Sequence, residues 1–157
     1  LLSPGIGLET HIQDVVGVIE SEELAKVVIV GHSYGGFVIT GACDRLRERI
    51  EHAVYLDGPA PNDGDRNGGF RSREEIERAM GPLLEGAYLP VRKEMIPLFG
   101  IPPSDTANTA WLERRLTPHP AQTYLDPIRL KNGGSTGLPR TYVFCNRAGP
   151  QSALRRY

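Results

Sequence analysis

The ten residues 27–36, VVIVGHSYGG, decide the fold of this chain. The first four are β-branched and show no polar alternation, which predicts a strand buried on both faces of a parallel sheet. The apolar pattern over residues 34–48 predicts a helix immediately after the strand. Between the two lies the pattern G-x-S-x-G around Ser33. This pattern places a serine on a sharp turn from strand to helix, the nucleophile elbow.

The glycines of this turn have a steric reason. We expect side chains at Gly31 and Gly35 to collide with the strand and the helix, and Gly36 to extend the same small surface. His32 lies beside the serine on the turn, where adjacent side chains diverge. It is therefore predicted to be structural and not the general base.

A serine on such a turn can act as a nucleophile. Ser33 would project its hydroxyl at the carboxyl end of the sheet, and the backbone N–H of Tyr34 would stabilise an oxyanion there. The alternative is a serine that caps a glycine-rich helix N-terminus and binds a phosphate or nothing. Phosphate loops typically show G-x-G-x-x-G or a Lys-Ser/Thr pair, and neither is present, which favours the nucleophile.

Helical and strand patterns alternate around the elbow, which indicates the α/β class, a mostly parallel sheet flanked by helices. The expected elements are a helix over 9–24, the strand over 27–30, the helix over 34–48, and strands over 53–56 and 140–145. Residues 61–128 separate the last two strands. They are rich in proline and contain helical patterns over 72–80 and 106–116. We predict that they form a cap or lid inserted into the domain.

The composition excludes several function classes. The 157 residues include 18 Gly and 13 Pro, so we expect long loops, whereas 39% hydrophobic and 24% charged residues are ordinary for a globular domain. A net charge of −1 provides no field that would attract nucleic acid or an anionic membrane. No apolar run approaches the roughly 20 residues of a membrane span. Two cysteines are too few for a disulfide framework and fit a reducing compartment, the cytoplasm.

Three stretches, HIQDVVGVIE at 11–20, the elbow at 27–36 and VYLDGPAPNDG at 54–64, resemble a bacterial branch of the α/β-hydrolase superfamily. This branch comprises small esterases similar to the plant methylesterases and hydroxynitrile lyases. The resemblance implies a carboxylic-ester hydrolase that acts on a small-molecule ester through an acyl-serine, without a cofactor or a metal. Two alternatives stay open: a hydroxynitrile-lyase-type reaction on the same fold, and a hydrolase-like binding module without catalysis.

A serine hydrolase of this kind also needs an acid, and Asp57 is the favoured candidate. It directly follows the strand over 53–56, and the carboxyl ends of neighbouring parallel strands converge on one site. Some superfamily members carry their acid after this strand. The plant enzymes carry it after the next strand, where residues 146–149 contain no carboxylate. Asp63 is the second candidate, and a simple Asp-Gly turn is the alternative interpretation of Asp57.

The catalytic histidine has no convincing candidate in the sequence. In this superfamily it follows the last strand, whereas no histidine follows His119 here. His119 lies between two prolines in the insertion and is predicted to be structural. His11 precedes the elbow strand, and His52 introduces the next strand at its amino end, away from the site. The family's first oxyanion loop, a His-Gly segment, is also absent from the start of the chain.

These gaps predict that residues 1–157 are an incomplete α/β-hydrolase domain, truncated at both ends. The full-length parent is then the esterase, and the chain by itself lacks a base for Ser33. Missing strands would leave open sheet edges and uncovered apolar faces. Such surfaces favour association, including the formation of a homo-oligomer.

Overall fold

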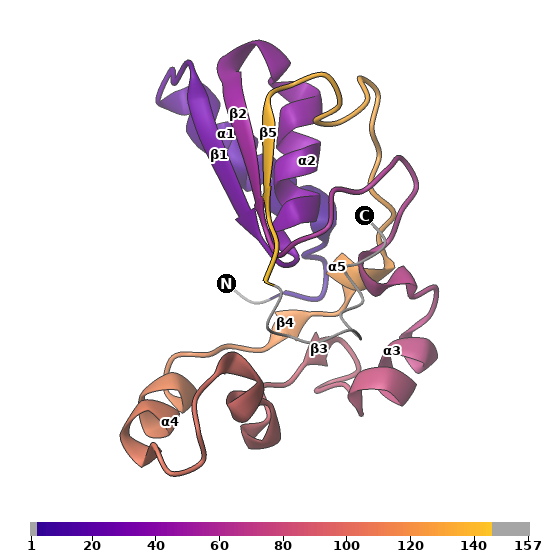
Figure 1. Cartoon of the computed structure of the whole chain (residues 1–157). Helices are drawn as coiled ribbons and strands as arrows, with labels where there is room; N and C mark the ends of the chain where they lie inside the picture. Colours follow the sequence, from indigo (N-terminus) through magenta and orange to yellow (C-terminus); the bar gives the residue numbers. More distant parts are fainter. Residues whose placement is uncertain (1–2, 146–157) are drawn as a thin grey trace.

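The computed structural model describes residues 3–145, apart from the side chains of residues 98 and 99. Figure 1 shows two parts, an open sheet backed by two helices and a smaller, irregular part built from the middle of the chain. The strands point towards the irregular part, so their carboxyl ends face it. The predicted fold class, a parallel sheet flanked by helices, is confirmed.

Among the described residues the sheet has three parallel strands in the order β1-β2-β5. They are β1 (Val27–His32), β2 (Ile50–Leu56) and β5 (Arg140–Val143). The register pairs His32 with Leu56 and Leu56 with Val143, so the three strands end at the same edge. Residues that directly follow these strands are therefore neighbours in space.

Two helices cover one face of the sheet and form the core with it. α2 (Gly35–Arg45) joins β1 to β2 through a 3₁₀ turn at Arg47–Arg49, and α1 (Leu8–Ser21) packs against α2. The buried positions of α1 recur every three or four residues, as an amphipathic helix requires: Leu8, Ile12, Val16 and Ile19. Gly41 lets the two helices approach closely, because a side chain there would overlap Ile12.

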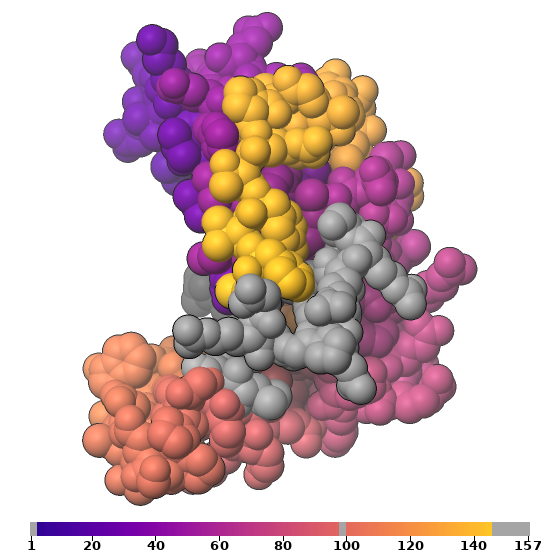
Figure 2. Space-filling model, viewed as in Figure 1, coloured from indigo at the N-terminus to yellow at the C-terminus, as the bar shows by residue number. Residues whose placement is uncertain are grey.

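The prediction that the elbow strand is buried on both faces is wrong for the described residues. Ile29 is buried, but Val28 and Val30 on the opposite face are 59% and 58% exposed. The reason is that α1 and α2 both pack on the Ile29 side of the sheet, and none of residues 3–145 covers the other side. In Figure 2 the atoms of β5 likewise form part of the outer surface.

The irregular part consists of residues inserted between β2 and β5. Its elements are η2 (Asn67–Gly69), α3 (Arg73–Met80), β3 (Tyr88–Leu89), η3 (Lys93–Phe99), α4 (Thr106–Glu113), β4 (His119–Pro120) and α5 (Gln122–Leu125), where η marks a 3₁₀ helix. β3 and β4 pair in antiparallel orientation. The two ends of the insertion are tied together, since Gly64 N–H donates to Ile128 O and Ile128 N–H donates to Asp65 O, both at 2.9 Å.

The helices are shorter than their sequence patterns. The helix predicted over 34–48 ends at Arg45, and the one predicted over 106–116 ends at Glu113. The helix predicted over 72–80 begins after Ser72, whose hydroxyl accepts a hydrogen bond from Glu75 N–H. The sequence does not predict β3, β4 or α5, because elements of two to four residues take their form from tertiary contacts.

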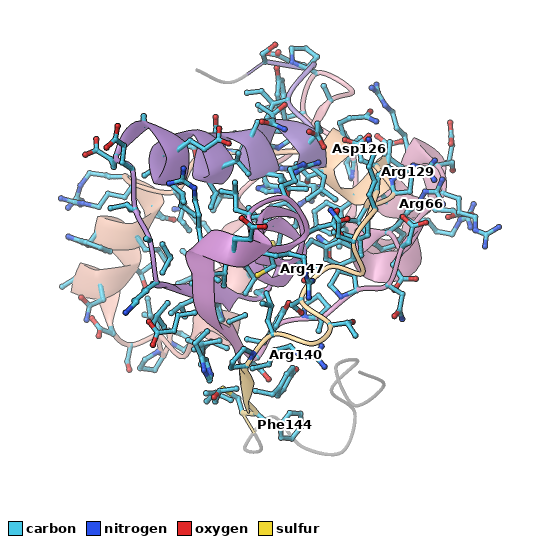
Figure 3. The ribbon with its side chains drawn as sticks, turned by 90° about the horizontal axis from the view of Figure 1, so that it is seen from above. Arg47, Arg66, Asp126, Arg129, Arg140 and Phe144 are labelled. Carbon is cyan, nitrogen blue, oxygen red and sulfur yellow. The ribbon has the colours of Figure 1, made fainter. Side chains whose placement is uncertain are left out.

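A buried carboxylate at the end of α2 holds the loop that leads into β5. Asp44 is 3% exposed and accepts hydrogen bonds from the backbone N–H groups of Lys131, Asn132 and Gly134 at 2.7–2.9 Å. Arg47 donates to three carbonyl oxygens of the same loop and points into it, as Figure 3 shows. The C-terminal end of α2 therefore fixes how β5 enters the sheet.

Asp44→Ala should lower the free energy of unfolding by about 2–4 kcal/mol, because it leaves three N–H groups of the loop without their acceptor. Urea unfolding of the full-length gene product, followed by circular dichroism, measures this loss. The control is Asp14→Ala on the exposed side of α1, which should change the unfolding free energy by less than about 0.5 kcal/mol. Equal effects of the two substitutions would contradict the structural role of Asp44.

The same carboxylate makes stability depend on pH. Burial raises the pKa of Asp44, but the hydrogen bonds from Lys131, Gly134 and Asn132 outweigh it, and the pKa lies below its usual value. The stabilisation is therefore present above about pH 4, the pKa of an unfolded aspartate, and is lost as the pH falls through the lower folded pKa. The difference in unfolding free energy between wild type and Asp44→Ala should be constant above about pH 5 and shrink below about pH 4. A difference that persists in strong acid would show that the carboxylate charge does not matter.

Candidate active site

Ser33 occupies the turn between β1 and α2 in a strained conformation. Its φ is 51°, in the left-handed region that residues other than glycine rarely adopt. The neighbouring backbone holds it there: Ser33 N–H donates to Leu56 O at 3.2 Å, and Ser33 O accepts from Gly36 N–H at 2.9 Å. The serine is exposed at the carboxyl end of the sheet, so its hydroxyl is accessible to a substrate.

Backbone crowding explains three glycines around this turn. A Cβ at Gly31 would lie 2.5 Å from Gly35 O, and one at Gly36 would overlap Pro59 O. Gly58 packs directly on the serine, since a Cβ there would lie 2.6 Å from Ser33 O. The expected collision at Gly35 is wrong: apart from its chain neighbours and the backbone of its own helix, no described atom lies within 4 Å of a Cβ at this position. Gly35 contributes its carbonyl to the crowding, whereas its own Cα faces open space.

The Tyr34 N–H is available at the start of α2. Tyr34 is the N-cap of the helix, with φ −50° and ψ −30°, and its N–H donates to none of residues 3–145. The first N–H groups of a helix carry partial positive charge from the helix dipole. An unoccupied donor beside an exposed serine is the arrangement expected of an oxyanion site.

The two candidate acids occupy different places. Asp57 follows β2 at the edge where Ser33 follows β1, and its carboxylate accepts from Cys145 N–H at 3.2 Å. Asp63 lies further along the chain, and its carboxylate accepts from Leu130 N–H at 2.8 Å, which ties it to the end of the insertion. Only Asp57 therefore shares the sheet edge with the serine.

The structure places all four histidines, and none contacts either carboxylate. His32 is exposed on the uncovered face of β1. His52 Nε2 lies 2.8 Å from Thr141 Oγ1 near the amino ends of the strands. His11 and His119 lie elsewhere, in a cluster with tyrosines described next. The described residues thus bring the serine and a candidate acid to one edge without a histidine between them.

A histidine–tyrosine cluster, formed by His11, Tyr34, His119 and Tyr124, lies directly beneath the elbow. Tyr34 OH and His11 Nδ1 share a hydrogen bond of 3.0 Å. The ring of His119 packs edge-on against Tyr34 and Tyr124, with centroid distances of 5.2 and 5.8 Å. Sequence reasoning missed this cluster because its members come from α1, the elbow, β4 and α5, and no local spacing connects them.

The cluster is buried enough to affect titration. Burial, followed by the nearby His11, lowers the pKa of His119 below its usual value, so this ring is neutral at pH 7. Burial also raises the pKa of Tyr34, with further contributions from Asp126 and Tyr124, so the phenol keeps its proton. These groups are therefore held as neutral hydrogen-bonding and packing partners.

An apolar cavity of about 430 Å³ opens on the other side of His119. Apolar side chains of the insertion form most of its wall, including Met80, Leu89, Met95 and Leu116, together with His119 and Tyr124 of the cluster. Two rings of the cluster thus separate the elbow side from a cavity of the size that small ligands occupy.

The family of this chain follows from its match to a known family profile. The profile of the alpha/beta hydrolase family matches residues 3–156, almost the whole chain. The chain belongs to the α/β-hydrolase family. The predicted membership and the predicted resemblance to small esterases and plant methylesterases are confirmed.

Individual relatives of this α/β hydrolase agree with the family. The carbendazim-hydrolyzing esterase of Nocardioides sp. (strain SG-4G) is 35% identical over 155 residues, which cover 96% of this chain and 64% of the relative. An extracellular α/β-hydrolase from a Paenibacillus species superposes with a TM-score of 0.71 at 24% identity, covering 90% of this chain and 60% of that one. The methylesterase MES16 from Arabidopsis superposes with a TM-score of 0.62 at 18% identity, covering 90% and 61%. The chain therefore spans about three fifths of the length of these proteins.

Residues 3–145 contain neither a metal-binding cluster nor a helix that could span a membrane. No three His, Cys, Asp or Glu side chains within residues 3–145 are grouped so that they could hold a metal ion. Each helix within the same residues is too short or too polar to pass through a lipid bilayer.

Proposed function

We propose that this chain carries the nucleophile of a serine hydrolase that cleaves small carboxylic esters. The main support for this proposal is the geometry of the nucleophile elbow. Ser33 is exposed at φ 51°, beside a Tyr34 N–H that no described residue occupies. A serine held in a strained turn at a helix N-terminus suits acyl transfer, because attack and oxyanion stabilisation can occur at one place.

In the proposed reaction Ser33 Oγ attacks the ester carbonyl carbon while a base takes the hydroxyl proton. The carbonyl π electrons move onto the oxygen, and the Tyr34 N–H stabilises this oxyanion. When the tetrahedral intermediate collapses, the alcohol leaves with the proton from the base, and an acyl-serine remains. Water then attacks the acyl-serine in the same way and releases the carboxylic acid and free Ser33.

We assign the orientation of the base to Asp57. Its support is position, since Asp57 and Ser33 follow paired strands at one sheet edge. None of His11, His32, His52 and His119 contacts Asp57, so none of them is assigned as the base. Asp63 is a weaker candidate, because its carboxylate is bound to Leu130 N–H near the insertion.

We further propose that residues 61–128 act as a cap that supplies the substrate pocket. The strands point towards this insertion, as Figure 1 shows, and its apolar cavity of about 430 Å³ reaches His119 and Tyr124 beneath the elbow. The apolar acyl or alcohol group of the ester would occupy this cavity. The polar ester bond would stay at the exposed serine.

Hydrolysis assays on the full-length gene product test this function. We expect turnover of p-nitrophenyl acetate and labelling by a fluorophosphonate, and the carbendazim-hydrolyzing relative makes carbendazim a second substrate to measure. A protein that neither turns over these esters nor reacts with the probe is a binding module. Cleavage of a cyanohydrin without ester hydrolysis would instead indicate a hydroxynitrile-lyase-type reaction.

A further inference from the structure

We propose that the Tyr34 side chain is a positioning residue: held by His11 and His119, it fixes the direction of the Tyr34 N–H that stabilises the oxyanion. This inference rests on the proposed function and concerns the same site. The backbone N–H and the side chain of Tyr34 lie in different surroundings. Its N–H lies at the open start of α2, and its ring lies in the histidine–tyrosine cluster.

The elbow needs such a restraint. A serine in the left-handed region costs on the order of 1 kcal/mol or more, and the surrounding structure has to impose it. The peptide between Ser33 and Tyr34 carries the N–H in question, so a rotation of this peptide that relaxed Ser33 would also turn the N–H away. The N-cap residue Tyr34 makes no capping hydrogen bond with its side chain. Its ring is therefore free to anchor the turn from the opposite side.

Two histidines hold the ring. His11 Nδ1 and Tyr34 OH lie 3.0 Å apart, and the His119 ring meets the Tyr34 ring edge-on at 5.2 Å. His119 is itself fixed by Thr123. The Thr123 hydroxyl donates its single proton to Pro120 O at 2.7 Å, so His119 Nε2 must carry a proton and donate it to Thr123 Oγ1, also at 2.7 Å.

The elements that carry these histidines are fixed relative to each other. Asp126, directly after α5, accepts from Leu8 N–H at the start of α1 (2.9 Å) and from Gln122 Nε2 of α5 (2.7 Å). Figure 3 shows Asp126 at this end of α1. Position 7 is glycine for the same reason, because a Cβ at Gly7 would overlap the Asp126 carboxylate. The ring of Tyr34 therefore lies between His11 of α1 and His119 of β4, and the hydrogen bonds of Asp126 hold α1 and α5 together beside it.

Tyr34 and His119 are held as neutral groups. The pKa of Tyr34 is raised by burial and by the charge of Asp126, and that of His119 is lowered by burial and by His11. Asp126 and Tyr124 are further ionisable groups close enough to influence the pKa of Tyr34. Both members of the pair stay neutral near pH 7, so their contribution is geometric. This distinguishes a positioning residue from a catalytic acid or base.

Kinetics of Tyr34→Phe in the full-length gene product test the inference, because this variant keeps the ring and removes the hydroxyl that is hydrogen-bonded to His11. We expect kcat for p-nitrophenyl acetate to fall about tenfold with KM unchanged within about twofold, less than the loss of a whole oxyanion donor. Binding of a trifluoromethyl ketone, whose adduct places an oxyanion in the same site, should weaken about tenfold as well.

Variants of His11 test whether restoring the hydrogen bond to Tyr34 restores kcat. His11→Leu should lower kcat as much as Tyr34→Phe does, and His11→Asn, which restores a hydrogen-bonding atom near Nδ1, should recover most of it. The double variant Tyr34→Phe/His11→Leu should be no slower than either single variant, because both remove one interaction.

Tyr55→Phe is the matched control. Tyr55 is a fully buried tyrosine whose hydroxyl lies 2.7 Å from Thr40 Oγ1 and 2.7 Å from Ser135 Oγ, so its removal costs stability while the contacts of the Tyr34 side chain stay in place. Its kcat should equal that of the wild type. Equal kcat in Tyr34→Phe, Tyr55→Phe and wild type would overturn the positioning role while the esterase function stands. A wild type without hydrolysis or fluorophosphonate labelling would overturn both the proposed function and the role built on it.

Discussion

Ser33→Ala in the full-length gene product should lower kcat/KM for p-nitrophenyl acetate by at least about a thousandfold, because the proposed reaction passes through an acyl group on this serine. Alanine adopts the same backbone conformation as serine at φ 51°, so the turn and the Tyr34 N–H should stay in place. The small residual rate would come from binding and oxyanion stabilisation alone.

The control for this prediction is Ser72→Ala, which removes the serine hydroxyl at the N-terminus of α3. Its hydroxyl caps α3 through Glu75 N–H, so the variant should lose about 1 kcal/mol of stability and keep its activity. Urea unfolding and initial rates, measured side by side, separate the two effects. More than a tenth of the wild-type rate in Ser33→Ala would contradict the role of this serine as nucleophile.

Gly36→Ala should have the largest effect on folding. A Cβ at this position overlaps the carbonyl oxygen of Pro59, a backbone atom that moves only if the chain after β2 moves. We expect a loss of more than about 3 kcal/mol in unfolding free energy, or no soluble protein at all. Solubility after expression and urea unfolding by circular dichroism measure the effect.

Gly35→Ala, one residue earlier, is the matched control. It lies in the first turn of α2, where no described atom outside its chain neighbours and its own helix backbone is within 4 Å of an added Cβ. Alanine also favours the helix over glycine by up to about 1 kcal/mol. Its stability should be unchanged or higher. If the two alanine variants lost the same stability, the packing of the elbow against Pro59 would not explain Gly36.

The sequence predicts those parts of the fold that depend on neighbouring residues in the chain. The β-branched run before Ser33 forms a strand, the glycines form the turn, and Leu8, Ile12, Val16 and Ile19 form one helical face. The two-sided burial of Val28 and Val30 fails because burial depends on what packs against a face. The sequence pattern of a strand does not reveal whether another element packs against each of its two faces.

The candidate site likewise has residues that a local sequence pattern predicts and residues that only the tertiary structure brings together. Ser33 and the Tyr34 N–H follow from one short motif, and Asp57 follows from the end of the neighbouring strand. The cluster beneath them does not, because Leu8 and Asp126, which align its two halves, are 118 positions apart. His119 has only two flanking prolines as a local signal. Its hydrogen bond to Thr123 and its contact with Tyr34 arise from the return of the insertion to the core.

The most direct test of Ser33 as the nucleophile is peptide mass spectrometry after labelling with a fluorophosphonate. The full-length gene product is incubated with the probe until ester hydrolysis stops, digested and sequenced by fragmentation. We predict one phosphonyl adduct, on Ser33, and none in the Ser33→Ala variant. An adduct on another residue, or continued hydrolysis of p-nitrophenyl acetate without any adduct on Ser33, would contradict the proposed mechanism.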